Sequence, residues 1–311
     1  MTAMTLGTWP TPLEEAPRLA SAIGLSRGRL WIKRDDLIGL GGGGNKVRKL
    51  QWTCGRAVAD GADTLVTSGA AQSNHARLTA AAAARLGLDV VLVLAGTPGT
   101  GRKSGNLALD ALLGATIVWV DGDDAALAAR VTEVAAELHD AGRRPAVIPF
   151  GGSTPETTNA YLEVAREIAS QGVQPDHVAV AVGSGATMAG LVRGFGAPRV
   201  LGVHCGAVSD PQRTVRDLFP ADDPAPEGLR IRTDQVGPGY GHVTAPVMHA
   251  MTLAARTEGV VLDPVYTGRA LAGLIAEIAD GGIDAESTVV LMHTGGLPGL
   301  FGSGAFLDEL G

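Results

Sequence analysis

Short apolar runs alternate with longer amphipathic stretches along most of the chain. The apolar runs predict buried strands at residues 64–67, 90–94, 116–120, 146–149, 177–182, 200–204 and 288–292. The longer stretches repeat apolar residues at the helical period and predict helices at residues 45–59, 73–86, 104–113, 123–141, 155–171, 186–195, 244–258 and 267–279. Buried strands that are separated by helices are typical of parallel sheets covered on both faces, so the pattern predicts an α/β fold.

Size and composition narrow the class of protein. A chain of 311 residues can bury a large core and is expected to divide into more than one domain. Because aromatic residues make up only 4% of the chain and there are 44 glycines, we expect an aliphatic core and glycine-built loops. The net charge of -7 and the lack of a basic tail argue against nucleic-acid binding and favour a small-molecule substrate.

The two cysteines and the apolar runs bear on the protein's location. Cys54 and Cys205 form no C-x-x-C pair, which argues against a disulfide or a zinc site, so no metal is expected. Cys54 follows Leu50 on the same predicted helix face, which indicates a small core residue. No apolar stretch is long enough to cross a membrane and no leader pattern is visible, so we expect a cytoplasmic protein without a membrane partner.

A glycine run at residues 41–44 leads into Asn45 and Lys46, where a helical pattern begins. Glycines let other backbone or a flat ligand approach closely. Arg48 and Lys49 share the segment, and both nearby positive charge and burial lower the pKa of an amine. A lysine with a lowered pKa is a nucleophile that forms imines with carbonyl compounds, which makes Lys46 a candidate catalytic residue. The alternative is a basic surface turn that opens a helix.

A second polar segment follows the predicted strand at residues 64–67. Residues 68–71 predict a small-residue turn, and the polar residues 72–75 then open an alanine-rich helix. Ser73 or Asn74 can cap this helix, which explains one polar residue but not four in a row. A helix N-terminus with unpaired N–H groups can also bind an anion such as a carboxylate.

A third segment, residues 183–190, places a glycine loop between a predicted strand and a predicted helix. This order presents backbone N–H groups to a phosphate. The spacing matches the dinucleotide pattern G-x-G-x-x-G/A only in part, and residues 200–206 lack the acidic residue that a Rossmann site needs. A smaller phosphate compound, such as pyridoxal phosphate, fits the segment better.

Residues 96–104 come close to a phosphate-binding P-loop. Arg102 stands where the lysine is required, and Lys103 comes one position late. Because this offset points the amine elsewhere, we interpret the segment as a loop that ends in a helix cap at Ser104. ATP chemistry is therefore not expected.

Together these segments resemble the D-cysteine desulfhydrase and 1-aminocyclopropane-1-carboxylate deaminase family of pyridoxal-phosphate enzymes. The motifs that match are WIKRDDL at residues 31–37, GGNK at 43–46, QSNH at 72–75, the glycine loop at 183–190, GPGYG at 237–241, LDPVYTG at 262–268 and HTGG at 293–296. The resemblance implies a tryptophan synthase β-like fold of two open parallel-sheet domains, with the cofactor in the cleft between them. It also implies a homodimer, with a small domain at residues 47–160 and a large cofactor-binding domain at residues 1–46 and 161–311.

The resemblance further implies roles for single residues. Lys46 would hold pyridoxal 5'-phosphate as an imine and then move a proton at the substrate. Ser73 would meet the carboxylate of an amino acid substrate, and Tyr240 and Tyr266 would act near the ring. The residues that would bind the cofactor are Lys46, Asn74 at the ring hydroxyl, Gly183, Ser184, Gly185, Ala186 and Thr187 at the phosphate, and Thr267 and Thr294.

Thr267 helps to choose within the family that the chain resembles. Deaminases of the cyclopropane substrate carry a glutamate after the tyrosine that corresponds to Tyr266. A carboxylate there would favour a protonated, electron-withdrawing pyridine ring. Threonine at this place resembles the desulfhydrases, and so favours β-elimination from a D-cysteine-like amino acid to give pyruvate, ammonia and the leaving group.

Other interpretations stay open. Residues 154–159 depart from the glycines that are usual in the family, and Arg269 stands where a lysine is common, so the choice of substrate could differ. The enzymatic alternatives are 1-aminocyclopropane-1-carboxylate deaminase, L-cysteate sulfo-lyase and a specialised biosynthetic relative. The alternative from another class is a catalytically silent protein that only binds pyridoxal phosphate.

Overall fold

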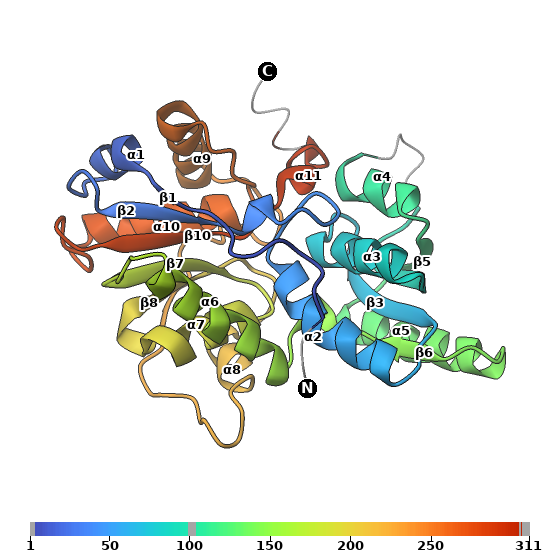
Figure 1. Ribbon diagram of the computed structural model, residues 1–311. Helices are drawn as coiled ribbons and strands as arrows, with labels where there is room; N and C mark the ends of the chain where they lie inside the picture. The colour runs from blue at the N-terminus through green and yellow to red at the C-terminus, as the bar shows by residue number, and fades with distance from the viewer. Residues whose placement is uncertain (1–3, 99–103, 305, 307–311) are drawn as a thin grey trace.

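The computed structural model describes residues 4–98, 104–304 and 306, which form two sheets with helices packed against them (Figure 1). The larger sheet has the strand order β1-β2-β10-β7-β8-β9, formed by β1 (Leu13–Glu15), β2 (Leu30–Arg34), β10 (Val289–His293), β7 (His177–Val182), β8 (Val200–His204) and β9 (Arg230–Arg232). The smaller sheet has the order β5-β4-β3-β6, formed by β5 (Thr116–Val120), β4 (Asp89–Ala95), β3 (Thr64–Ala70) and β6 (Pro145–Val147). The strand pairs are parallel except for β1 with β2.

Helices connect the strands in the order that a parallel sheet requires. They are α1 (Pro17–Ala22), α2 (Lys46–Ala59), α3 (Asn74–Leu86), α4 (Gly105–Leu112), α5 (Asp124–Asp140), α6 (Asn159–Ser170), α7 (Ala186–Phe195), α8 (Pro211–Arg216), α9 (Ala245–Glu258), α10 (Thr267–Ala279) and α11 (Leu297–Leu300). Short 3-10 turns lie at η1 (Asp35–Leu37), η2 (Phe150–Gly152), η3 (Glu156–Thr158) and η4 (Ala197–Arg199).

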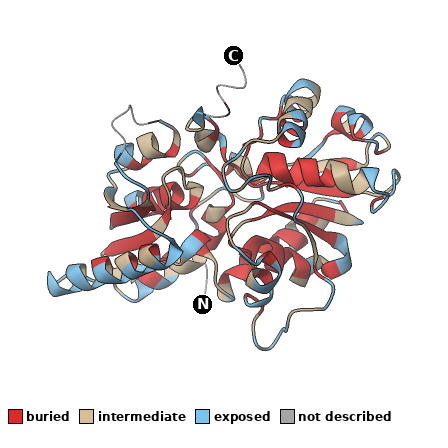
Figure 2. Cartoon of the chain, turned by 180° about the vertical axis from the view of Figure 1, so that it is seen from behind, coloured by how far each residue is buried: buried red, intermediate tan, exposed pale blue. Residues whose placement is uncertain are grey.

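Both faces of each sheet are buried, because successive side chains of a strand point to opposite faces. In β4, Val91 and Val93 pack with Leu127 of α5, whereas Leu92 and Leu94 lie in a separate cluster that includes residues of α2 and α3. The strands of the larger sheet divide their side chains between two clusters in the same way. Figure 2 shows the buried residues concentrated along the two sheets and on the helix faces that cover them.

The predicted α/β fold is confirmed, and each predicted strand and helix overlaps an observed element. Two boundaries were wrong by three residues or more, and the others lie within two residues of the observed ones. Residues 68–71 do not form a turn from the start, because β3 continues to Ala70. The helix predicted at residues 155–171 is divided into η3 and α6, which begins at Asn159. Ser104 is the N-cap residue of α4, as predicted, but its side chain makes no capping hydrogen bond among the described residues. Residues 99–103 of the P-loop-like segment lie outside the described residues.

The hydrophobic pattern did not predict β1, β2, β9, α1, α8 and α11, and each of these is short or carries charged residues. Lys33 shows why. This residue lies in β2 and is 0% exposed, although lysine is usually a charged surface residue. Its Nζ lies 2.6 Å from Oε1 of Glu167 in α6. Burial of a charged side chain is costly unless a partner is also present, and sequence periodicity does not reveal that partner.

The smaller sheet is built from one continuous part of the chain, β3 to β6, whereas the larger sheet draws on both ends of it. We propose that residues 47–160 form the small domain and that residues 1–46 and 161–311 form the large one. Lys46 then lies at a crossing between the two. None of the helices in the described part of the chain is long and apolar enough to span a membrane.

Candidate active site

One cavity collects most of the predicted site residues at the carboxyl ends of β3, β7 and β10, the usual place for a ligand in parallel α/β sheets. The predicted residues that line it are Lys46, Ser73, Asn74, Gly183, Ser184, Gly185, Thr187, Tyr266 and Thr294. Tyr240 lies in an adjoining cavity of about 160 Å³, which shares Asn74 and Tyr266 with the first. Ala186 and Thr267 are buried beside the site and are not among the lining residues.

Lys46 is the first residue of α2, and its amine is set for nucleophilic chemistry. The pKa of Lys46 is lowered to about 8, mainly by burial and in part by the Arg77 guanidinium, while Cys205 and Asp263 act in the opposite direction. A pKa of about 8 leaves about a tenth of the amine neutral at pH 7, and the neutral amine can attack a carbonyl. The pKa is therefore lowered as the sequence predicted, but the neighbouring cation responsible is Arg77 rather than Arg48 or Lys49.

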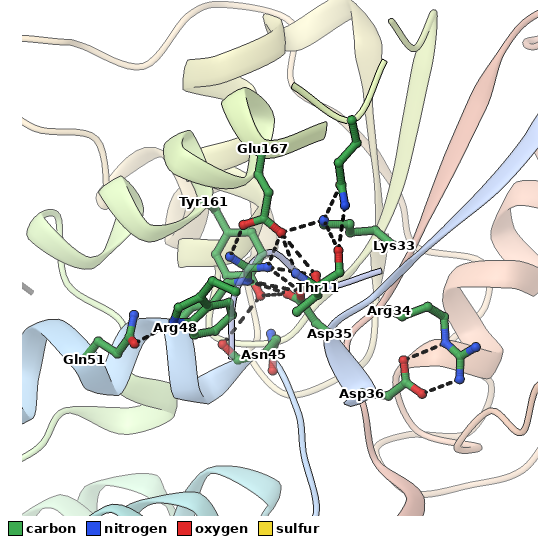
Figure 3. A network of polar contacts seen from close by, with 12 residues as sticks. Thr11, Lys33, Arg34, Asp35, Asp36, Asn45, Arg48, Gln51, Tyr161 and Glu167 are labelled. Carbon is green, nitrogen blue, oxygen red and sulfur yellow. Dashed lines mark hydrogen bonds and ion pairs between the residues drawn. The ribbon is translucent and has the colours of Figure 1, made fainter. Parts of the chain in front are cut away.

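Arg48 turns away from the cavity into a buried polar network (Figure 3). Its Nη2 lies 2.8 Å from Oδ1 of Asp35, and its Nη1 lies 2.9 Å from Oε2 of Glu167. Tyr161 donates to Oδ2 of Asp35 at 2.7 Å. These bonds tie the first turn of α2 to η1 and α6, so the network holds Lys46 in place relative to the larger sheet.

The glycine run before Lys46 is required by close packing. A Cβ atom at Gly43, whose φ is +77°, would lie 1.9 Å from the carbonyl oxygen of Asp36. Arg77 donates to the carbonyl oxygens of Gly41 and Gly43 at 2.8 and 2.9 Å. The loop is thus a packed, hydrogen-bonded structure, which no other residue type can form at this place.

Among the described residues, Ser73 and Asn74 each keep a donor group that can face the cavity. Ser73 is the N-cap of α3 and accepts from the backbone N–H of Ala76 at 3.1 Å, which leaves its hydroxyl proton available. Oδ1 of Asn74 accepts from Asn106 and Arg77, at 3.0 and 3.3 Å. The side-chain NH₂ of Asn74 therefore remains to donate to a ligand oxygen.

The glycine loop after β7 forms a cradle for an anion. Gly185 has a φ of +90° and precedes α7, whose N-terminal N–H groups and dipole favour negative charge. Asn45, which the sequence analysis did not single out, links this cradle to the amine: its Oδ1 accepts from Lys46 at 3.1 Å and its Nδ2 donates to Oγ1 of Thr187 at 3.1 Å.

The two predicted tyrosines form a pair. Their rings are edge-to-face with centroids 6.3 Å apart, and the amine of Lys46 lies 5.9 Å from the ring centroid of Tyr266. Burial raises the pKa of Tyr266 well above its usual value, so its hydroxyl group keeps its proton at neutral pH.

Thr267 and Asp263 fix the backbone that carries Tyr266. Oδ1 of Asp263 accepts from the N–H and the hydroxyl group of Thr267, at 2.8 and 2.7 Å, and its Oδ2 accepts from the N–H of Tyr266 at 2.9 Å. The hydroxyl of Thr267 in turn accepts from the N–H of Asp263 at 2.8 Å. Thr267 therefore has no proton left to donate, and one lone pair remains on its oxygen.

Arg269, which stands where a lysine is common in the family, holds the segment that carries Tyr240. Its guanidinium is 0% exposed and donates to the carbonyl oxygen of Cys205 at the end of β8. It also donates to the carbonyl oxygens of Gly239 and His242, at 3.0 and 2.9 Å. A short segment without helix or strand is thereby fixed between β8 and α10.

Comparison with known proteins agrees with this geometry. A family model described as "Pyridoxal-phosphate dependent enzyme" matches residues 4–295. The chain belongs to this family. It is 40% identical over 309 residues to a D-cysteine desulfhydrase from Klebsiella pneumoniae, an alignment that covers 94% of this chain and 93% of the relative. It is 39% identical over 308 residues to a Pyrococcus furiosus protein provisionally described as 1-aminocyclopropane-1-carboxylate deaminase, with 94% and 91% covered.

A solved structure described as an "ACC deaminase homologue" matches with a TM-score of 0.88 at 35% identity, covering 99% of this chain and 96% of the other. The predicted tryptophan synthase β-like fold is thus confirmed, as is the dependence on pyridoxal phosphate. Among the described residues, no group of three or more His, Cys, Asp and Glu could hold a metal ion.

The residues present suit this cofactor. The amine of Lys46 can hold an aldehyde, the loop at residues 183–187 can take a phosphate, and the NH₂ of Asn74 can meet a ring oxygen. When bound, pyridoxal phosphate supplies an electron sink for carbanion chemistry at an amino acid. The protein would supply position, an amine that can carry a proton, and the hydroxyl groups of Tyr240 and Tyr266.

Proposed function

We propose that the protein catalyses β-elimination from a β-substituted, D-cysteine-like amino acid, which gives pyruvate, ammonia and the leaving group. It is an enzyme of the group that contains relatives named D-cysteine desulfhydrase and 1-aminocyclopropane-1-carboxylate deaminase. The observation that carries the finer proposal is Thr267, which follows Tyr266 and donates its hydroxyl proton to Asp263.

The family resemblance places residue 267 beside the cofactor's ring nitrogen. A glutamate there would favour the protonated pyridine, whereas the Thr267 oxygen has one lone pair to offer and no charge. A weaker electron sink suffices for elimination, because a good leaving group drives the step. Opening an unactivated cyclopropane ring requires stronger electron withdrawal by the cofactor ring.

We assign the other roles as follows. Lys46 moves the proton at the substrate's reacting carbon, the hydroxyl of Ser73 donates to the substrate carboxylate, and the NH₂ of Asn74 orients the ring. The linked hydroxyl groups of Tyr240 and Tyr266 stand ready to give a proton on the side where the leaving group departs. We also propose that the protein is a homodimer and that it is located in the cytoplasm.

The second candidate is 1-aminocyclopropane-1-carboxylate deaminase, favoured by the descriptions of the Pyrococcus relative and the solved structure. Incubation with D-cysteine, L-cysteate, β-chloroalanine and the cyclopropane amino acid distinguishes the candidates when pyruvate and 2-oxobutyrate are both assayed. We expect the highest kcat/KM for pyruvate release from a β-substituted alanine. A higher value for 2-oxobutyrate would move the assignment to the deaminase, and release from L-cysteate alone would favour a sulfo-lyase. No turnover of any of them would favour a specialised relative or a silent binder.

A further inference from the structure

Lys49 is a buried amine with an unusual position behind the anion cradle. It lies on α2 close to Lys46, is 1% exposed, and its Nζ donates to Oγ of Ser153 at 3.1 Å. Burial and the neighbouring Lys46 lower the pKa of Lys49 well below its usual value, and no acidic group in the described part of the chain offsets them. A buried ammonium without an anionic partner is costly, so a protonated Lys49 would need a negative charge that its described surroundings do not provide.

Lys33 provides a comparison within the same fold. It is also fully buried, but its amine lies 2.6 Å from the Glu167 carboxylate and 2.8 Å from the carbonyl oxygen of Thr11. Lys33 thus has a permanent partner in the structural network of Figure 3. Among the described residues, Lys49 instead bonds to the neutral hydroxyl group of Ser153, which contacts Ser184 in the cavity lining.

A row of hydroxyl groups joins Lys49 to the cradle. Oγ of Ser153 lies 2.7 Å from Oγ of Ser184, which belongs to the glycine loop and lines the cavity. An ammonium group only donates, so Ser153 accepts from a protonated Lys49 and donates to Ser184. The proton of Ser184 then points to whatever acceptor fills the cradle, and an anion there polarises the row in one direction.

The backbone between Lys49 and the cradle is built for this closeness. A Cβ atom at Gly151 would lie 2.0 Å from Oγ of Ser184, and one at Gly152 would lie 3.4 Å from Cβ of Lys49. Both glycines have a φ of +63°. The loop therefore brings Ser153 between the lysine and the cradle in a way that other residues would not allow.

We propose that Lys49 is the charge partner of the cofactor's phosphate group. When a phosphate dianion occupies the loop at residues 183–187, Lys49 takes up one proton from solvent, and Ser153 and Ser184 carry its hydrogen bond to the anion. The only bond formed in this step is N–H, and the positive charge gained offsets one negative charge of the ligand. The inference rests on the proposed function and on the binding of the cofactor's phosphate by the loop at residues 183–187.

The other basic groups that face Lys49 are Lys46 on its own helix and His75 on α3. Oγ1 of Thr67 donates to the carbonyl oxygen of Ile148, so His75 must donate to Thr67 through Nε2, and its buried Nδ1 has no partner among the described residues. Burial, Lys46 and Lys49 hold the pKa of His75 well below its usual value. His75 therefore stays neutral in mildly alkaline solution, and the two lysines are the groups that can gain a proton.

Calorimetric titration of the full-length apoprotein with pyridoxine 5'-phosphate tests the proposal. This alcohol cannot form an imine, and its phosphate is a dianion at about pH 8 because the second pKa of a phosphate monoester is about 6. Heats in buffers of different ionisation enthalpy report the protons taken up. We expect net uptake by the wild type, and a binding affinity that falls as the pH rises further, since binding is linked to protonation.

Two substitutions separate charge from proton uptake. Lys49→Arg carries a permanent charge, so it should bind within about threefold of the wild type but lose the share of uptake that belongs to Lys49. Lys49→Met should lose the same share and bind at least about tenfold more weakly, which corresponds to roughly one unit of linked pKa. Lys46→Ala controls for protons taken up by that amine. Ser153→Ala, which keeps the lysine, should also reduce the uptake.

The contrary outcomes are distinct. Binding by the wild type without proton uptake would overturn the role of Lys49 while leaving the proposed cofactor site intact. Uptake that is unchanged in Lys49→Arg would assign the proton elsewhere and overturn it as well. Failure of the wild type to bind the phosphate compound would overturn the cofactor placement and the role of Lys49 together. If the Lys49 variants do not fold, Lys46→Ala decides the matter: uptake that persists in it supports the role of Lys49, and its loss there would overturn that role.

Discussion

The hydroxyl groups of Tyr240 and Tyr266 lie 2.9 Å apart, although the residues are 26 positions apart in the chain. Tyr266 stands at the N-terminus of α10, and Tyr240 lies in the segment that Arg269 fixes. Since one hydroxyl group must accept from the other, one of the two protons is free to be given to a ligand. The hydroxyl group that gives it can then receive a proton from the other. This relationship leads to the first prediction.

Tyr240→Phe should lower kcat by about tenfold or more, because it removes the group that restores the proton of Tyr266, while KM changes little. Steady-state kinetics over a range of pH measure both parameters. Tyr161→Phe is the matched control, since its hydroxyl group contacts Asp35 in the buried network. It should lower Tm, with a loss of about 1–3 kcal/mol from the unpaired acceptor, more than it lowers kcat. Equal effects of the two variants on kcat would contradict the role of Tyr240.

The purified protein should be yellow, and borohydride should abolish its visible absorption band, because Lys46 has a lowered pKa and lines the cavity. Lys46→Ala should remove the band and the turnover while phosphate binding is partly retained. Absorption spectroscopy and equilibrium dialysis measure the two properties. A colourless wild type that cannot be reconstituted with pyridoxal phosphate would refute the assignment.

Arg269→Met should reduce both stability and kcat, because the carbonyl oxygens of Cys205, Gly239 and His242 lose their donor, at roughly 1–3 kcal/mol for the buried Cys205 oxygen and less for the two part-buried ones. Arg269→Lys should be intermediate, since an ammonium group cannot span the same three oxygens. Thermal unfolding and kinetics together test this. A variant that loses stability but keeps the wild-type kcat would show that Arg269 does not position Tyr240.

Thr267→Glu should change the cofactor spectrum and slow β-elimination, because it retunes the ring nitrogen and places a second carboxylate beside Asp263. Thr267→Ser keeps the hydroxyl group and should behave like the wild type in both respects. Spectra of the loaded enzyme and the ratio of kcat/KM for β-chloroalanine and the cyclopropane substrate are the measurements. An unchanged spectrum in Thr267→Glu would place residue 267 away from the ring.

The buried network should make stability depend on pH in acid. Arg48 and Lys33 hold the pKa of Glu167 at about 2, below its usual 4.5 and against the effect of burial. A lowered pKa in the folded state means that the stabilisation is complete above the unfolded pKa and is lost as the pH falls from about 4.5 toward 2. Urea unfolding should show a loss of about 2 kcal/mol across this range. In Glu167→Gln, stability at neutral pH should be lower, and this acid-dependent part should be absent.

The sequence alone determined the class of fold and the segments that form the site. Alternation of apolar strands with amphipathic helices depends on local periodicity, so strands such as β7 were predicted at their observed bounds. The motifs that follow β3, β7 and β10 meet because the carboxyl ends of parallel strands lie at the same edge of a sheet. The family resemblance assigned Lys46, Ser73 and Gly185 to one cofactor site, and the structure brings all three to one cavity.

Tertiary structure decided where the side chains within those segments point. Lys46, Arg48 and Lys49 are close in sequence, yet one lines the cavity, one enters the ion network and one lies behind the cradle. The partners that settle this are far along the chain: Glu167 is 119 residues from Arg48, and Ser153 is 104 residues from Lys49. A buried charge takes the direction in which a partner is found, and that direction exists only once distant strands and helices have packed together.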